Sequence, residues 1–198
     1  IRGKAMQEAV PVGVGAMAAL LGLNFATAQT VAAEAAQGDV CQAANDNDPS
    51  QVVVSGHKAA VERAVELAKA AGAKRAMLLP VSAPFHCALM APAADVMAEA
   101  LASVEINATA VPLVANVSAE ALSDPIMIRA LLVEQVTGSV RWRESVLYMG
   151  ETHGISEIWE IGAGKALSGM VRRINKDIAC RNIGTPEDIA GALAALNG

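Results

Sequence analysis

A strand–helix–strand–strand–helix–strand pattern up to residue 80 is the feature that most limits what this chain can fold into. An alanine-rich segment that stops at Gly38 is typical of a helix, and the β-branched run QVVVSG is typical of a strand. The next segment places five small apolar residues between Ala60 and Ala68 on one helical face. The pattern predicts strands at 15–23, 39–46, 51–56 and 74–82 and helices at 26–38 and 57–73. This order is that of the ferredoxin-like unit, which we place at residues 14–80.

Beyond Pro84 the chain alternates helices and strands. We expect helices at 87–104, 124–136, 141–154, 163–175 and 185–198, and strands at 110–118, 155–162 and 178–184. Such alternation predicts a mostly parallel sheet with helices packed on it, although three strands are fewer than an open sheet usually has. The opening IRGKAMQEAV has helical spacing, and DNDPS (46–50) predicts a loop. The fold class is therefore α/β, with residues 1–13 and 81–198 in a larger lobe that carries 14–80 as an insertion.

Composition and charge exclude several classes of function. The net charge is -5 with no block of Lys or Arg, which argues against a nucleic-acid partner. No apolar run approaches the ~18 residues of a membrane span, and no signal peptide is visible. The cysteines Cys41, Cys87 and Cys180 are far apart and odd in number, which favours a reducing, cytoplasmic setting. No CxxC or HExxH spacing indicates a metal. We expect a monomer without metal or cofactor.

The stretch VSAPFHCALM contains the candidate catalytic residue His86. A lone histidine is more often structural than catalytic, but this one lies where a strand ends and a helix begins, a common place for functional groups in α/β folds. Pro84 restricts the approach of the chain, and Phe85 provides an apolar neighbour. His57 and His153 lack this setting, and we interpret both as solvated surface residues.

Other candidate residues keep two interpretations. The segment EIGAGKALSG (160–169) has the strand–glycine turn–helix order that can bind an anion, or it is simply a tight turn. Arg2 could pair with a carboxylate, although a solvated surface arginine is the commoner case. Asn45 and Asn47 are amide donors or turn residues, and Gln135 is unremarkable by itself.

At VSAPFHCALM the chain resembles the malonyl-CoA:acyl carrier protein transacylases, the acyltransferases of fatty-acid synthesis. Further stretches agree in order and extend the resemblance over essentially all 198 residues, among them NDNDPSQVVVSGHKAAVERA, LLVEQVTGSVRWRESVLYM and EIGAGKALSGMVRRI. The resemblance implies a large α/β-hydrolase-like lobe with an inserted ferredoxin-like lobe. It also implies malonyl-CoA and acyl carrier protein as partners, and transfer of the malonyl group through a malonyl-serine ester.

The resemblance assigns roles to four residues. His86 matches the general base that takes the proton of the serine. Gln135 matches the residue whose backbone carbonyl orients the imidazole. Arg2 matches the arginine that pairs with the free malonyl carboxylate. Phe85 is similar to the residue of malonyl-selective members that crowds the extra methyl group of methylmalonyl.

The nucleophile of the family lies on a GHSxG turn, and this sequence has none. Ser55 closes a predicted strand, and Ser168 lies within a predicted helix. The resemblance therefore implies that the serine precedes residue 1 and that the chain is the C-terminal two-thirds of the enzyme, inactive alone. The alternative is a binding module that holds acyl carrier protein or coenzyme A without turnover. Arg172 and Arg173 are candidates for a basic docking patch on either interpretation.

Overall fold

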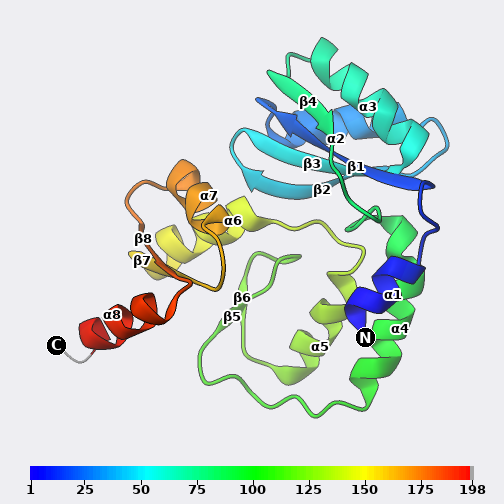
Figure 1. Cartoon of the computed structure of the whole chain (residues 1–198). Helices are drawn as coiled ribbons and strands as arrows, with labels where there is room; N and C mark the ends of the chain where they lie inside the picture. Colours follow the sequence, from blue (N-terminus) through cyan, green and yellow to red (C-terminus); the bar gives the residue numbers. More distant parts are fainter. Residues whose placement is uncertain (197–198) are drawn as a thin grey trace. The chain divides into compact units, whose positions relative to one another are not determined.

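The computed structural model describes residues 1–196 and divides into two compact units. The first unit is Ile1–Ser145, and the second begins at Val146. The strongest feature of the first unit is a four-stranded antiparallel sheet with the order β2-β3-β1-β4 (Figure 1). Its strands are β1 (Gly15–Leu21), β2 (Cys41–Asp48), β3 (Gln51–His57) and β4 (Arg75–Leu78).

Helices α2 (Phe25–Ala36) and α3 (Lys58–Ala70) complete the βαββαβ order that the sequence predicts for residues 14–80. Both helices cover one face of the sheet (Figure 1). Alternate strand residues point to this face, so that Leu20 of β1 and Val54 of β3 are fully buried against the helices. Burial of such aliphatic side chains stabilises the unit by about 1.5–3 kcal/mol each.

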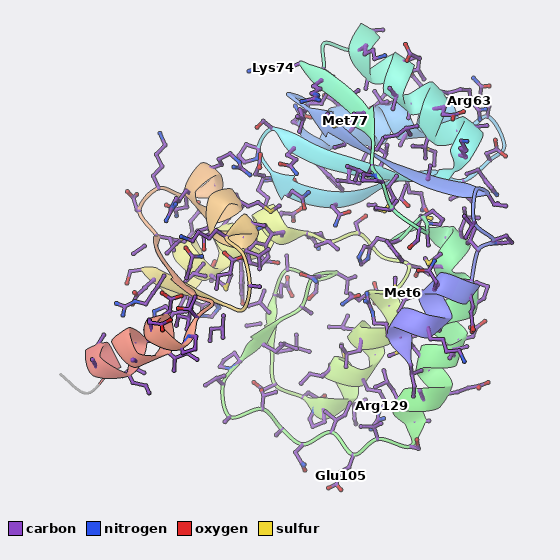
Figure 2. All side chains as sticks on the ribbon, viewed as in Figure 1. Met6, Arg63, Lys74, Met77, Glu105 and Arg129 are labelled. Carbon is purple, nitrogen blue, oxygen red and sulfur yellow. The ribbon has the colours of Figure 1, made fainter. Side chains whose placement is uncertain are left out.

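Arg63 of α3 closes the end of α2 (Figure 2). Its Nε donates to the carbonyl of Ala35 at 2.8 Å, and its Nη2 donates to that of Ala36 at 2.9 Å. These carbonyls belong to the last turn of α2, where no intrahelical N–H is available to them. Asp39 accepts a further bond from the same guanidinium at 3.1 Å.

The remaining elements of the first unit carry a second core. They are α1 (Arg2–Glu8), the 3-10 turn η1 (Ala88–Met90), α4 (Ala91–Ala102), β5 (Leu113–Val114), β6 (Ala121–Leu122), α5 (Pro125–Glu134) and α6 (Trp142–Leu147), whose end passes into the second unit. Helix α1 lies along α4 (Figure 1), and Met6 is buried there with Met90 and Val136. This packing brings the start of α1, at Arg2, close to the end of α5, at Gln135.

The second unit contains a parallel strand pair between helices. Its elements are the π-helical turn η2 (Tyr148–Thr152), β7 (Glu157–Ile161), α7 (Ala166–Ile174), β8 (Ala179–Ile183) and α8 (Pro186–Leu196). Strands β7 and β8 pair in parallel, as expected for strands connected through a helix. Among the described residues, none of the helices is both long and apolar enough to cross a membrane.

The glycine turn at 160–169 is a capped helix start. The Glu160 carboxylate accepts the backbone N–H of Leu167 at 3.0 Å and that of Ser168 at 2.8 Å. It also accepts the Ser168 hydroxyl at 2.6 Å, and this bond is the largest cause that lowers the pKa of Glu160. These N–H groups at the start of α7 are used by the protein's own carboxylate, which favours the tight-turn interpretation over an anion contact.

Three predicted elements differ from the structure, and one of them, the strand predicted at 74–82, is shortened to Arg75–Leu78. The strand predicted at 110–118 is wrong, because only Leu113–Val114 pairs, and it pairs antiparallel with Ala121–Leu122 in a short hairpin. The mostly parallel sheet is therefore confined to β7 and β8 among the described residues. The loop predicted at 46–50 is also wrong in most of its length, because β2 continues to Asp48 and two register shifts absorb the irregular sequence.

The structure also shows the contacts of the two other histidines, His57 and His153. His57 is partly exposed, with 34% of its side chain accessible, and its Nδ1 also accepts the backbone N–H of Val40, just before β2, at 2.9 Å. His153 is exposed, and its ring contacts the edge of Tyr148 with ring centroids 4.8 Å apart.

Candidate active site

A pocket opens beside the face of the four-stranded sheet that the helices leave free. Its volume is about 620 Å³, within the range of small-molecule sites. Strands β1, β2 and β3 contribute to its wall, together with α1 and the segment 79–86. The polar residues of the lining are Arg2, Gln7, Asn45, Asn47 and His86. The structure thus brings Arg2, Phe85 and His86, predicted from separate parts of the sequence, to one pocket.

The backbone of His86 is in a left-handed conformation, with φ +59°. This conformation is uncommon for a residue with a side chain and occurs often at functional sites. His86 lies in the connection between β4 and η1, as expected from its position after a predicted strand. The start of η1 is anchored separately, because Oε1 of Gln42 accepts the backbone N–H of Ala88 at 2.7 Å.

The imidazole of His86 is oriented by a backbone carbonyl. Its Nδ1 lies 3.0 Å from the carbonyl oxygen of Gln135. Gln135 caps the C-terminus of α5, where helix carbonyls lack an intrahelical partner, so this oxygen is available to an outside donor. An acceptor at this position requires the proton on Nδ1, which leaves the lone pair of Nε2 free to accept a proton.

The electrostatic environment keeps this imidazole neutral. Burial lowers the pKa of His86, and the positive charge of Arg2 lowers it further. The backbone of Gln135, and to a smaller extent that of Gly138, acts in the opposite direction by stabilising the imidazolium. The net effect lowers the pKa below its ordinary value, so the ring is in its basic form at neutral pH.

Gln135 also contacts Arg2. Nη2 of Arg2 donates to the side-chain Oε1 of Gln135 at 2.6 Å, across 133 positions of sequence. Nε of Arg2 is buried and has no hydrogen-bond partner among the described residues. A buried guanidinium N–H without an acceptor is costly, and such a group in a native structure calls for an explanation.

Phe85 forms the apolar side of the pocket. It packs with Met17, Val53 and Leu79, on the sheet face opposite α2 and α3. The alternation of side chains along β1 and β3 determines this, because Met17 and Val53 are the neighbours of residues that face the helices. Sequence analysis did not select Met17 or Val53, although the same alternation contains the signal.

Asn45 and Asn47 line the pocket and are not part of a turn. They stand two residues apart on β2 and therefore share a face, whereas Asp46 between them is fully buried. Sequence analysis could not decide whether the two asparagines are amide donors or turn residues, because a loop was predicted at 46–50 in place of the end of β2. Gln7 was missed, although it follows Gly3 at the i+4 spacing of one helix face.

Neither serine considered in the sequence is placed to serve His86 as a nucleophile. Ser55 is fully buried in β3 and does not belong to the lining of the pocket. Ser168 donates to Glu160 at the start of α7 and accepts from Nδ2 of Asn182 at 2.7 Å. Both serines are therefore buried parts of the fold that lie outside the lining of the pocket.

Comparison with known proteins identifies the family of this site. Residues 1–161 match the family model described as "Acyl transferase domain". The chain belongs to this acyltransferase family. A curated relative, the malonyl CoA-acyl carrier protein transacylase of Escherichia coli (strain K12), is 48% identical over 193 residues. That alignment covers 98% of this chain and 62% of the relative, and the relative from Bacillus subtilis (strain 168) is 42% identical with 62% covered.

Solved structures agree with the sequence comparison. The acyl-carrier-protein-S-malonyltransferase of Bartonella henselae matches with a TM-score of 0.94 and 53% identity, over 100% of this chain and 62% of that one. A malonyl-transacylase in complex with a type II polyketide synthase carrier protein matches with a TM-score of 0.94 and 42% identity, over 98% of this chain and 62% of that one. The chain thus spans about three-fifths of the length of these relatives, and the α/β fold class is confirmed.

Proposed function

We propose that this protein takes part in the transfer of a malonyl group from malonyl-CoA to the phosphopantetheine thiol of acyl carrier protein. The observation that carries the proposal is the contact of one residue, Gln135, with both His86 and Arg2. A base and a carboxylate-binding cation are thereby held in one pocket. Relatives whose names state this activity, at 48% identity and below, support it.

The chemistry requires a serine in addition to the residues described. The serine oxygen attacks the thioester carbonyl while Nε2 of His86 accepts the hydroxyl proton. The carbon–sulfur bond breaks, and the coenzyme A thiolate leaves with the proton that His86 returns. The thiol of the carrier then attacks the malonyl-serine ester with His86 as base, and the serine is regenerated. Nδ1–H of His86 stays on the carbonyl of Gln135 throughout and holds the tautomer.

We propose that the serine lies outside the 198 residues, on the GHSxG turn implied by the resemblance. On this proposal the 198-residue chain alone does not form the acyl-enzyme. The division into a small lobe at 14–80 and parts of a hydrolase-like lobe at 1–13 and 81–198 belongs to the same proposal. The alternative is a module that binds acyl carrier protein or coenzyme A without turnover. The presence of a tautomer-fixed base disfavours this alternative, since binding alone does not need one.

Covalent labelling separates the two functions. The natural protein is incubated with radioactive malonyl-CoA, denatured and digested, and the label is located by peptide mass mapping. We expect a base-labile malonyl ester on a serine outside the 198 residues, discharged by added holo acyl carrier protein. Reversible binding without any covalent ester would establish the binding module instead.

We also propose the setting in which the transfer takes place. The described cysteines are free thiols, which supports a reducing compartment such as the cytoplasm. A monomer would suffice, since His86, Arg2 and Gln135 come from one chain. Arg172 and Arg173 in the last turn of α7 remain candidates for docking an acidic carrier.

Phe85 is expected to select malonyl over the larger methylmalonyl group. Phe85→Ala removes the ring that packs with Met17 and Leu79, and the freed volume admits one more methyl group. We expect the ratio of methylmalonyl to malonyl transfer to rise about 10-fold or more, the scale of one methyl group in an apolar pocket. The measurement is competition between the two coenzyme A thioesters. An unchanged ratio in a folded variant would remove Phe85 from the selectivity wall.

A further inference from the structure

We propose that the ion pair between Asp46 and Arg143 is a positioning device for the base, because it fixes the segment that begins at Gln135 against strand β2. Neither Asp46 nor Arg143 lines the pocket, and His86 bonds the Gln135 carbonyl instead of this pair in the described structure. Their catalytic effect, which rests on the proposed function, would pass through the Gln135 carbonyl. The structural part of the proposal, control of the His86 tautomer, is independent of that function.

The pair itself has a fixed side-on geometry. Nε of Arg143 lies 3.1 Å from Oδ1 and 3.0 Å from Oδ2 of Asp46, and Nη2 lies 2.8 Å from Oδ2. The side chain of Asp46 is 1% exposed, whereas that of Arg143 is 28% exposed. Burial raises the pKa of Asp46, and the bond to Arg143 opposes that rise. A planar guanidinium that meets both carboxylate oxygens restricts orientation more than a point charge can.

The backbone around the pair extends the small sheet by one more segment. The N–H of Asp46 donates to the carbonyl of Val140 at 2.9 Å, and the N–H of Val140 donates to the carbonyl of Ala44 at 2.8 Å. The hydroxyl of Ser139 donates to the carbonyl of Ala43 at 2.5 Å. The chain just after Gln135 is therefore bonded to the strand that presents Asn45 and Asn47 to the pocket.

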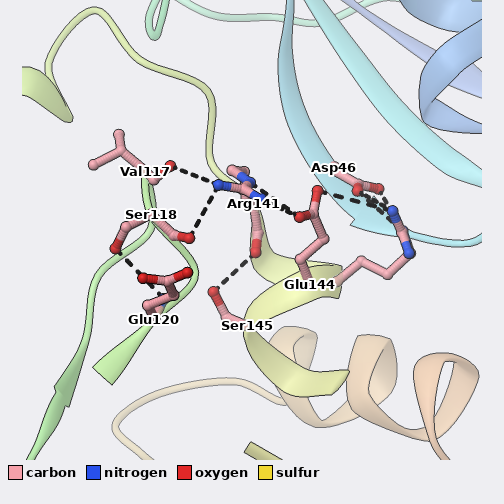
Figure 3. Close-up of polar contacts among 8 residues, drawn as sticks. Asp46, Val117, Ser118, Glu120, Arg141, Glu144 and Ser145 are labelled. Carbon is pink, nitrogen blue, oxygen red and sulfur yellow. Dashed lines mark hydrogen bonds and ion pairs between the residues drawn. The ribbon is translucent and has the colours of Figure 1, made fainter. Parts of the chain in front are cut away.

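A second anchor holds the same segment from the other side (Figure 3). Nη1 of Arg141 donates to the carbonyls of Val117 and Ser118, at 3.2 and 3.0 Å, in the turn of the β5–β6 hairpin. The same guanidinium bonds the carboxylate of Glu144, and the other oxygen of that carboxylate lies 4.0 Å from Nη2 of Arg143. Charges thus alternate from the hairpin turn to β2, and Asp46 is the buried end of the series.

The segment between these anchors and Gln135 is short and tightly packed. A Cβ atom on Gly138 would lie 2.7 Å from Cγ1 of Val117 and 3.0 Å from the carbonyl oxygen of Glu134. The backbone of Gly138 also contributes to the pKa of His86, so two backbone groups of this turn act on the imidazole. A displacement of the anchored end would be transmitted to the Gln135 carbonyl, and small displacements at a reacting group have large kinetic effects.

The test removes both partners of the pair together. Loss of one partner leaves a buried unpaired charge and destabilises a fold, whereas two apolar residues of similar volume often restore stability. We therefore compare the parent with Arg143→Lys, which keeps the charge, and with the double variant Asp46→Leu/Arg143→Met. Arg2 is unchanged in all of them. Asp39→Asn is the control, because it removes the negative charge from another carboxylate–arginine pair of the first unit, the more exposed pair with Arg63.

The readouts are the thermal midpoint, nitrogen NMR shifts of the His86 ring, and transfer kinetics of the natural protein. We expect the double variant to melt near the parent but to lose the exclusive Nδ1–H tautomer, with Arg143→Lys intermediate. Its kcat should fall about 10-fold while KM for malonyl-CoA stays unchanged. Asp39→Asn should leave the His86 signals as in the parent.

Two results would overturn the proposal. One is a folded double variant with the parent tautomer and kcat. The other, if the double variant does not fold, is an Arg143→Lys variant that is folded and has unchanged His86 signals. Failure of the proposed function gives a different pattern, in which the parent itself shows no malonyl transfer while the tautomer still responds to the variants.

Discussion

Substitution of His86 in the natural protein is expected, on the proposed function, to lower malonyl transfer by about 10³-fold or more while the fold is retained. General bases contribute about 10²–10⁴-fold, and loss of a member of a catalytic group removes most of that contribution. His86→Ala removes the base but places alanine at φ +59°, which costs about 1 kcal/mol. His86→Asn is the better matched variant, because asparagine tolerates this conformation and has no lone pair suited to accept a proton. Near-normal transfer by a folded His86→Asn protein would remove His86 from the mechanism.

The pH dependence of the parent gives an independent check on the same residue. Only the neutral imidazole accepts a proton, so kcat/KM falls as the pH falls through the pKa of His86. Because burial and Arg2 hold that pKa below its ordinary value, we expect the acidic limb to lie below the ordinary histidine range. The limb should be absent from the residual activity of His86→Asn. An acidic limb at the same pH in that variant would assign it to another group.

The sequence predicts the small sheet well because its signals are local. Strands β1 and β3 carry apolar or β-branched runs, and α3 keeps Ala60, Val61 and Ala64 on its buried face. The strand prediction at 110–118 is wrong because strand pairing there depends on a partner outside the segment. Its apolar residues suggest a strand, but in the described structure only Leu113–Val114 finds a partner, in a hairpin that turns through Ala119 at φ +55°. Pairing depends on what lies opposite, which a single segment does not contain.

The residues of the candidate site likewise include some that a local sequence pattern can predict and some that depend on tertiary contacts. His86 stands out in the sequence because it lies in a loop between a predicted strand and a predicted helix. Arg2 received a predicted role only from the resemblance. The contact of Arg2 with Gln135 spans 133 positions, and the carbonyl that receives His86 is a backbone group with no side-chain signal. Asp46 was concealed by a loop-forming composition, since Asn, Asp and Pro are typical of turns. Its burial against Arg143 is a property of the assembled tertiary structure.

Arg2 determines, on our proposal, which acyl group the pocket accepts. Its Nε is buried without a partner among the described residues, and its Nη2 is already bonded to Gln135. A malonyl carboxylate would complete the hydrogen bonding of the guanidinium, whereas an acetyl group would leave it unpaired. A charge-assisted bond contributes about 1.5–3 kcal/mol, which at the upper end is roughly a 10²-fold preference.

Arg2→Ala should therefore reduce the preference for malonyl over acetyl transfer by about 10²-fold. The variant also loses the bond to the Gln135 side chain, which can disturb the neighbouring base and slow both reactions. The ratio of the two rates cancels this common defect, so the measurement is competition between malonyl-CoA and acetyl-CoA with the same protein. Arg2→Lys is the matched control: it keeps the charge but not the planar fork, and its ratio should fall between the other two. If Arg2→Ala keeps the parent ratio, the carboxylate is recognised elsewhere, and the unpaired Nε of Arg2 has no part in the choice of substrate.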